Sequence, residues 1–301
     1  MSSFGFIGLG NMGAPMAANL VKSGERDNLH TVLGFDVVPA SRQTSAQDGV
    51  RIVANARASV SDADVVITML PGGEHVMSVW QDVLPVAKQG ALFIDCSTID
   101  VASARAAHAL AAEHGIAALD APVSGGVGGA KAATLTFMVG GSTAAFARGK
   151  PVLERMGKRI VHCGAAGNGQ VAKICNNMIL GASMIAVSEA FVLGEKLGLS
   201  HQALFDVASA SSGQCWSLTS YCPVPGPVPT SPANNGYKPG FSAALMLKDL
   251  KLAREAAASV GANTALGAHA AEIYEHFAQE GHSAADFSAI INLVRGSSED
   301  G

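Results

Sequence analysis

The chain has 301 residues, enough for about two domains, and 49% of them are hydrophobic against 15% charged. This composition supports a large buried core and argues against disorder. A net charge of −4 and an aromatic content of 5% argue against a nucleic-acid partner, because phosphate binding needs basic surface and base stacking needs aromatic rings.

The first half of the chain alternates short apolar runs with helical patterns. Strands are expected at residues 4–9, 31–36, 65–70, 91–96, 116–120, 135–140 and 159–163. Helices are expected at residues 12–23, 76–83, 101–113 and 143–156. Because these strands are apolar almost throughout, they fit a mostly parallel sheet with helices on both faces. The pattern predicts a doubly wound α/β domain over residues 1–163.

The second half, residues 164–301, is expected to be all-helical. Helical patterns cover residues 170–197, 201–210, 243–260, 264–280 and 284–294. The segment from Cys222 to Gly240 interrupts them, and its six prolines suit neither a helix nor a central strand. It is either a linker or an ordered loop over a site. We favour the loop, because helical patterns resume in the same domain.

Membrane insertion and secretion are not expected. The longest uncharged helix-like stretch, Ile174 to Ser188, is shorter than the ~20 residues that span a bilayer. The N-terminus enters a strand pattern at Phe4 without the basic segment of a signal peptide. The five cysteines are scattered and include no Cys-x-x-Cys pair, so neither disulfides nor a metal site are expected. We expect a cytoplasmic protein.

The first motif with chemical meaning is Gly8-Leu9-Gly10-Asn11-Met12-Gly13, between the first expected strand and helix. The first two glycines allow a tight turn and the close approach of a pyrophosphate, while the third allows the helix to pack on the strand. The helix N-terminus adds unpaired N–H groups and a positive dipole end. A plain structural turn is the alternative, but the context favours dinucleotide binding.

Asp36 ends the second expected strand, 23 residues after Gly13. A carboxylate at this place accepts hydrogen bonds from the adenosine ribose and repels a 2′-phosphate, so it favours NAD over NADP. A solvated strand-end aspartate is the alternative. Arg42 lies close enough in sequence to keep an NADP site open.

Three further turns follow expected strands. Leu70-Pro71-Gly72-Gly73 and Ser97-Thr98 should line a cofactor cleft, because ligands of open α/β sheets bind outside the carboxyl ends of the strands. Ordinary turn chemistry would look the same. In the segment 120–129, four glycines in five positions bare the backbone N–H groups around Ser124. That pattern fits an anion nest for a substrate carboxylate, with a flexible surface loop as the alternative.

Lys173 and Asn177 lie four residues apart in the long helical pattern and therefore share a helix face. A lysine among apolar residues can extend its amine to solvent. Held in a cleft, it can instead have a lowered pKa and act as a general acid/base. The spacing alone does not decide between these. For Lys248-Asp249, a solvated helix face is the default interpretation.

Together these motifs resemble the β-hydroxyacid dehydrogenase family. The resemblance rests on Gly8–Gly13 with Pro15 and Met16, the loop 120–130, Gly169-x-x-x-Lys173-x-x-x-Asn177, and Lys248-Asp249-Leu250. It runs from about Phe4 to Leu293. The stretch Ser211 to Ser217, followed by the proline-rich segment and Phe241, is similar to the 3-hydroxyisobutyrate dehydrogenase branch.

The resemblance implies a Rossmann domain over residues 1–163, an all-helical substrate and oligomerisation domain over residues 164–301, and NAD as cofactor. It implies that Lys173 is catalytic and that the substrate is held by Ser124, Gly125, Gly126 and Asn177. Cofactor contacts are expected from Gly8, Leu9, Gly10, Asn11, Met12, Asp36, Leu70, Pro71, Thr98, Phe241 and Lys248. Trp216 should form an apolar wall beside the substrate, unless it packs in a helical core.

The sequence thus predicts oxidation of 3-hydroxyisobutyrate to methylmalonate semialdehyde with NAD, in valine breakdown. Two alternatives stay open: reduction of tartronate semialdehyde or glyoxylate by the same machinery, and a non-catalytic dinucleotide-binding module. The expected partner is a small β-hydroxyacid, with no nucleic acid and no membrane. As in the family, the expected assembly is a homodimer or homotetramer.

Overall fold

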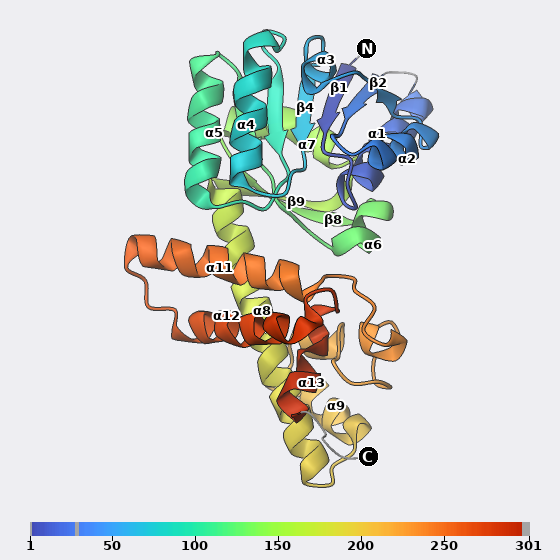
Figure 1. The fold of residues 1–301 in the computed structure, drawn as a ribbon, viewed down its shortest axis with the longest axis vertical. Coiled ribbons are helices and arrows are strands. Elements are labelled where there is room, and N and C mark those ends of the chain that lie inside the picture. Colours follow the sequence, from blue (N-terminus) through green and yellow to red (C-terminus); the bar gives the residue numbers. More distant parts are fainter. Residues whose placement is uncertain (1, 28–29, 297–301) are drawn as a thin grey trace. The chain divides into compact units, whose positions relative to one another are not determined.

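The computed structural model describes residues 2–27 and 30–296 (Figure 1). The chain divides into two compact units, Met1–Lys173 and Ile174–Gly301. The division falls inside one continuous helix, α8 (Asn168–Lys196), which starts in unit 1 and continues in unit 2. The boundary expected at residues 163 and 164 lies ten residues earlier and stays a prediction.

The described part of unit 1 contains one sheet of nine strands in the order β3-β2-β1-β4-β5-β6-β8-β7, with β9 paired to β8. The strands are β1 (Ser2–Ile7), β2 (His30–Phe35), β3 (Arg51–Ile52), β4 (Val65–Thr68), β5 (Leu92–Asp95), β6 (Ala117–Asp120), β7 (Val123–Ser124), β8 (Leu135–Gly140) and β9 (Gly157–Gly164). Strands β1 to β6 pair in parallel, and β8 runs antiparallel to β6 and β7. The expected mostly parallel sheet is confirmed.

Helices cover both faces of this sheet, because apolar side chains along its strands point alternately to one face and to the other. On β4, Val65 and Ile67 face one core, whereas Val66 faces the other. The first core includes α1 (Gly13–Asp27), α6 (Gly126–Lys131) and α7 (Thr143–Leu153), and the second includes α3 (Ala56–Val60), α4 (Gly73–Val83) and α5 (Val101–Glu113). The helix α2 (Pro39–Gln47) follows β2 (Figure 1). The carboxyl ends of β1, β2, β4 and β5 therefore share one edge.

Unit 2 is helical, as expected. After α8 come α9 (His201–Ser209), α10 (Trp216–Thr219), α11 (Ala243–Val260), α12 (Ala265–Phe277) and α13 (Ile290–Arg295), with short helical turns at Pro232–Asn235, Ala278–His282 and Phe287–Ala289. Its main core joins Met184 of α8 to Leu250 of α11 and Tyr274 of α12. Gly181 of α8 lets Leu250 approach closely, because an added Cβ would lie 3.0 Å from its Cδ2 atom.

The proline-rich segment is an ordered loop, so its interpretation as a linker is wrong. Cys222, Val224 and Val228 are buried and pack in a second core with Phe191 of α8. The Tyr237 hydroxyl donates to the carbonyl of Pro223 at 2.8 Å, which ties the two ends of the loop together.

The helix α8 is about as long as the helical pattern expected at residues 170–197. The uncharged stretch Ile174 to Ser188 is too short to cross a bilayer, but the 29-residue helix contains an 18-residue window of mean hydropathy 1.5 and is long and apolar enough to do so. Half of that window is buried inside the protein, as in the core helix of a globular domain. This is weak support for a membrane span.

Candidate functional site

The glycine-rich turn joins β1 to α1. Gly8 has a φ of +95°, and a Cβ there would lie 2.2 Å from the carbonyl oxygen of Met69. A Cβ on Gly13 would lie 1.8 Å from the carbonyl oxygen of Gly8. Gly10, in contrast, has open space around it. Gly8 and Gly13 therefore allow the tight turn and the close packing of α1 against it. Gly10 leaves room for a ligand to reach the backbone.

Asp36 lies directly beside this turn. Its Oδ2 accepts a hydrogen bond from the Leu9 amide at 2.6 Å, and its Oδ1 accepts from the Val38 amide at 2.7 Å. Arg42 donates from Nη1 to the Asp36 carbonyl at 2.6 Å. Gly10 and Asn11 at the tip of the turn are exposed, whereas Met12 packs partly against the core. The structure thus fixes the Asp36 carboxylate against the backbone of the glycine-rich turn.

The turns after β4 and β5 are joined by a buried network. The Leu70 amide donates to Ser97 Oγ at 2.8 Å, and Ser97 Oγ donates to Asp95 Oδ1 at 2.6 Å. Thr68 Oγ1 donates to the same Asp95 oxygen at 2.7 Å. Burial raises the pKa of Asp95 to about 6, against hydrogen bonds from Ser97 and Thr68 that lower it. The network fixes the turns that carry Pro71 and Thr98.

Sequence reasoning missed Asp95, although one signal was available. The run Leu92–Asp95 is a buried strand that ends in an acidic residue, and the next residues, Cys96 and Ser97, are buried as well. A carboxyl group at that place needs hydrogen-bond donors from within the protein.

The segment after β6 is ordered, so its interpretation as a flexible surface loop is wrong. Val123 and Ser124 form β7 and pair with β8, and α6 begins at Gly126. Gly125 and Gly126 have φ values of +129° and +60°, which only glycine adopts readily. Ser124 and Gly126 are half-buried and Gly125 is exposed.

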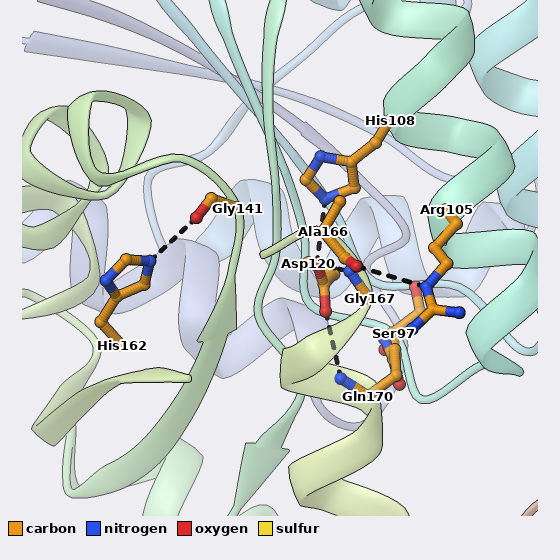
Figure 2. Close-up of polar contacts among 9 residues, drawn as sticks. All are labelled: Ser97, Arg105, His108, Asp120, Gly141, His162, Ala166, Gly167 and Gln170. Atoms are coloured by element: carbon orange, nitrogen blue, oxygen red, sulfur yellow. Dashed lines mark hydrogen bonds and ion pairs between the residues drawn. The ribbon is translucent and has the colours of Figure 1, made fainter. Parts of the chain in front are cut away.

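A second carboxylate, Asp120, lies beside Asp95, because the two residues are register partners on the parallel strands β6 and β5. It ends β6 and accepts hydrogen bonds from the backbone amides of Gly167 and Gln170, at 2.8 and 3.1 Å. His108 Nε2 lies 2.9 Å from its Oδ1 (Figure 2). The Gln170 side chain reaches the turn after β5 and donates to the Ser97 carbonyl at 2.8 Å. These contacts hold the start of α8, which carries Lys173.

Lys173 and Asn177 lie one helical turn apart on α8. Lys173 is only 6% exposed, so its side chain does not extend into solvent. Asn177 is buried; its Nδ2 donates to the Asp249 carboxylate, and its Oδ1 accepts from Asn176 Nδ2 at 2.9 Å. The orientation of the Asn177 amide is therefore fixed. Lys248, next to Asp249 on α11, is half-buried rather than on a solvated face.

Trp216 belongs to a row of stacked rings in unit 2. It is 51% exposed, so the alternative that it packs in a helical core is wrong. Its ring stacks on Tyr221 with centroids 4.9 Å apart, and Tyr221 in turn stacks on Phe287 at 5.3 Å. Phe241 contacts Phe287 edge-on at 5.8 Å. Trp216 and Phe241 are thus parts of one aromatic cluster.

Asp286 supports this cluster and was missed in the sequence. It is buried, and its Oδ2 accepts hydrogen bonds from the Tyr221 hydroxyl at 2.9 Å and from the Gly240 and Phe241 amides at 2.9 and 3.2 Å. Burial, with the nearby Asp286 charge, raises the pKa of the Tyr221 phenol. The three partners of Oδ2 lie 45 to 65 residues away in the chain, and only the bonds of Oδ1 with the amide and hydroxyl of Ser288 are local. In residues 2–27 and 30–296, no three His, Cys, Asp or Glu side chains gather as metal ligands would.

Comparison with known proteins agrees with this arrangement. Residues 3–164 match the family described as the NAD binding domain of 6-phosphogluconate dehydrogenase. Residues 167–294 match the family described as NAD-binding of NADP-dependent 3-hydroxyisobutyrate dehydrogenase. The two matches meet at the start of α8 and cover nearly the whole chain.

Individual relatives match over their full length. The chain is 57% identical over 295 residues to a probable 3-hydroxyisobutyrate dehydrogenase of Mycobacterium tuberculosis, covering 98% of both chains. It is 44% identical over 296 residues to an NAD-dependent L-serine dehydrogenase of Pseudomonas aeruginosa, covering 97% of this chain and 98% of that one. A solved structure of the Mycobacterium tuberculosis 3-hydroxyisobutyrate dehydrogenase with L-serine superposes with a TM-score of 0.94, at 57% identity, over 98% of this chain and 100% of that one.

Proposed function

The chain belongs to the NAD-dependent 3-hydroxyacid dehydrogenase family that includes 3-hydroxyisobutyrate dehydrogenase, and within it we propose that the substrate is 3-hydroxyisobutyrate, oxidised to methylmalonate semialdehyde. One observation carries this choice of substrate: 57% identity, over 98% of both chains, to a relative named for it. Membership of an enzyme family also removes the alternative of a non-catalytic module.

The residues of unit 1 fit a dinucleotide cofactor. The open space at Gly10 admits a pyrophosphate to the backbone, and the fixed carboxylate of Asp36 suits a ribose with free hydroxyls. When bound, NAD supplies the acceptor for the hydride of the substrate. We assign its contacts to Gly8, Leu9, Gly10, Asn11, Met12, Asp36, Leu70, Pro71, Thr98, Phe241 and Lys248.

Lys173 would be the general acid/base of this reaction. Its amine takes the proton of the substrate hydroxyl while a hydride leaves the carbon that bears this hydroxyl. In the reverse direction its ammonium returns that proton. Asn177 orients the hydroxyl, while Ser124, Gly125 and Gly126 hold the carboxylate. The burial of Lys173 supports this role, because a lysine shielded from water can be tuned for proton transfer.

L-Serine is a second candidate substrate. It is also a 3-hydroxyacid, and it carries an ammonium group where 3-hydroxyisobutyrate carries a methyl group. A relative 44% identical is named an NAD-dependent L-serine dehydrogenase, and the matching solved structure holds L-serine. Trp216 does not decide between the two substrates, because an indole face packs against a methyl group and also attracts an ammonium ion.

A substrate panel tests the proposal. The purified protein is assayed with 3-hydroxyisobutyrate, L-serine and glycerate, each with NAD and with NADP, by the absorbance of the reduced nicotinamide. We expect the highest kcat/KM for 3-hydroxyisobutyrate with NAD. A higher value for L-serine would make it the substrate, and a higher value for glycerate would favour the tartronate semialdehyde alternative. No turnover with any of them would contradict the enzyme assignment.

We also propose a homodimer or homotetramer in the cytoplasm, acting in valine breakdown. The helix α8 exposes Ile179 and Leu193, and Leu197 is exposed directly after its end. Exposed apolar side chains along a helix of this length suit contact with a second copy. The five cysteines are unpaired, which suits a reducing compartment. Light scattering of the purified protein measures the assembly, and a monomer at micromolar concentration would contradict it.

A further inference from the structure

The helix that carries Lys173 begins without a cap of its own. Gly167 precedes α8 with a φ of +83°, has no side chain, and the first turn of the helix contains no acidic residue. The first amides of a helix have no partner within it and usually bond to an N-cap side chain. Gln170 is the third residue of the helix, and its backbone amide is the one that normally donates to an N-cap side chain.

Asp120 supplies the missing cap from a different element. Its Oδ1 accepts from the Gly167 amide at 2.8 Å and its Oδ2 accepts from the Gln170 amide at 3.1 Å (Figure 2). It is 1% exposed and brings a negative charge to the positive end of the helix. The two amides lie 47 and 50 residues from Asp120, so the contact joins the end of β6 to the start of α8.

Two glycines make this close approach possible. A Cβ on Gly169 would lie 2.6 Å from the Asp120 carbonyl oxygen and 2.3 Å from that of Met138. A Cβ on Gly140 would lie 2.5 Å from Asp120 Oδ1. The first turn of α8 is therefore pressed against the ends of β6 and β8, and only glycine at these positions allows it.

His108 completes the group on the side away from the helix. Its side chain lies on α5, is 14% exposed, and donates from Nε2 to Asp120 Oδ1 at 2.9 Å, since an ionised carboxylate only accepts. Arg105, one turn earlier on α5, reaches the Ala166 carbonyl in the segment that leads into α8 (Figure 2).

The start of α8 is also tied to the turn after β5. Gln170 is buried, its Nε2 donates to the Ser97 carbonyl at 2.8 Å, and its Oε1 accepts from the Ile99 amide at 3.2 Å. Thr98 lies between those two partners. Lys173 follows Gln170 by three residues, a rise of about 4.5 Å along the helix axis.

We propose that Asp120 is a positioning residue that sets the first turn of α8, and with it Lys173, against the cofactor-side turn Ser97–Ile99, with His108 orienting its carboxylate. It touches neither substrate nor cofactor in this role. The inference rests on the proposed function only in the part given to Lys173. A residue that serves stability alone would have the same contacts but would not control turnover in the folded protein.

The test is Asp120→Asn. The amide has one acceptor oxygen, so whichever way it turns, Gly167 or Gln170 faces an NH₂ group in place of an oxygen. Hydrogen exchange across residues 167–173, followed by mass spectrometry, should become faster. With 3-hydroxyisobutyrate and saturating NAD, kcat should fall about 10- to 100-fold, because a displacement of the order of 1 Å costs that much, while KM for NAD stays within about threefold.

Ser142→Ala is the matched control. Ser142 Oγ caps α7 by accepting from the Ala145 amide at 3.2 Å, and α7 carries none of the proposed site residues. This variant should lower stability and speed exchange at the start of α7 only, while kcat stays unchanged. If Ser142→Ala lowers kcat as much as Asp120→Asn does, the effect is general and the proposal is wrong.

If Asp120→Asn does not fold, two His108 variants test the proposal in its place. His108→Ala removes the imidazole donor and should lower kcat, whereas His108→Gln places an amide N–H near the position of Nε2 and should restore most of it. Full kcat and unchanged exchange in His108→Ala would remove His108 from the proposal.

Two outcomes with Asp120→Asn overturn the inference. One is faster exchange at residues 167–173 with an unchanged kcat, and the other is a raised KM for NAD with an unchanged kcat. The exchange measurement does not depend on which residue transfers the proton. Failure of the proposed function is therefore seen separately, as normal turnover in Lys173→Ala.

Discussion

Asp36 Oδ2 accepts a hydrogen bond of 2.6 Å from the Leu9 amide, which joins the end of β2 to the glycine-rich turn after β1. With Oδ1 held by the Val38 amide at 2.7 Å, both carboxylate oxygens have fixed directions. Two backbone amides thus hold the Asp36 carboxylate beside the glycine-rich turn, in the wall of the proposed cofactor site.

The first prediction concerns cofactor choice. NAD should be preferred to NADP, because the Asp36 carboxylate would meet the 2′-phosphate with like charge. Asp36→Ala should narrow the ratio of the two kcat/KM values by about tenfold, which is ~1.4 kcal/mol of differential binding. Arg42, which donates to the Asp36 carbonyl, remains in that variant to attract a phosphate. Asp206→Ala on α9 is the matched control. Equal efficiency with both cofactors in the unmodified protein would show that Asp36 does not select.

The second prediction concerns substrate selectivity. Trp216→Ala should lower kcat/KM for 3-hydroxyisobutyrate more than for 3-hydroxypropionate, which lacks the methyl group. A contact of methyl size is worth only ~1–3 kcal/mol of selectivity. Because Trp216 is half-exposed and stacks on Tyr221, its removal leaves the buried core intact. Val207→Ala, an exposed apolar residue on α9, is the control. Equal losses on both substrates together with a lower Tm would contradict the assignment.

The third prediction concerns the pH dependence of stability. Burial raises the pKa of Asp95 to about 6 from an unfolded value of 3.8. Between these values the folded protein holds a proton that the unfolded chain has lost. The free energy of unfolding therefore falls as the pH rises from about 4 to about 6, by up to about 3 kcal/mol.

Asp95→Asn should flatten that dependence, because the amide does not titrate. The measurement is urea unfolding across this pH range, compared with Asp206→Asn, which changes the charge at an exposed site. Asp95 Oδ2 is buried and has no hydrogen-bond partner among the described residues, which fits a carboxyl group that resists ionisation. An unchanged slope in Asp95→Asn would show that Asp95 does not titrate differently on folding.

Much of the fold could be predicted from local pattern. The strand Leu135–Gly140 and the helices Val101–Glu113 and Ala243–Val260 have the expected bounds, because each is a strong periodic or apolar run. The strand β3 has two residues and gives no pattern. The helix α6 was missed because three of its six residues are glycines, which disfavour a helix in isolation.

The candidate site was predictable only where its parts are consecutive in the chain. The glycine-rich turn and the spacing of Lys173 and Asn177 are local signals. The contacts of Asp120 with Gly167 and Gln170 join segments 47 and 50 residues apart, and those of Asp286 with Tyr221 span 65. Such pairs depend on tertiary packing, so a single sequence carries no mark of them.

Lys173→Ala is the decisive variant, because Lys173 is the proposed proton carrier in the oxidation of 3-hydroxyisobutyrate. We predict that kcat falls by about 10²–10⁴-fold, the usual worth of general acid–base catalysis, while the Kd for NAD stays nearly unchanged. Lys150→Ala, which removes an exposed lysine paired with Glu154, should leave both values unchanged. A loss of kcat below about tenfold in Lys173→Ala would show that Lys173 is not the proton carrier.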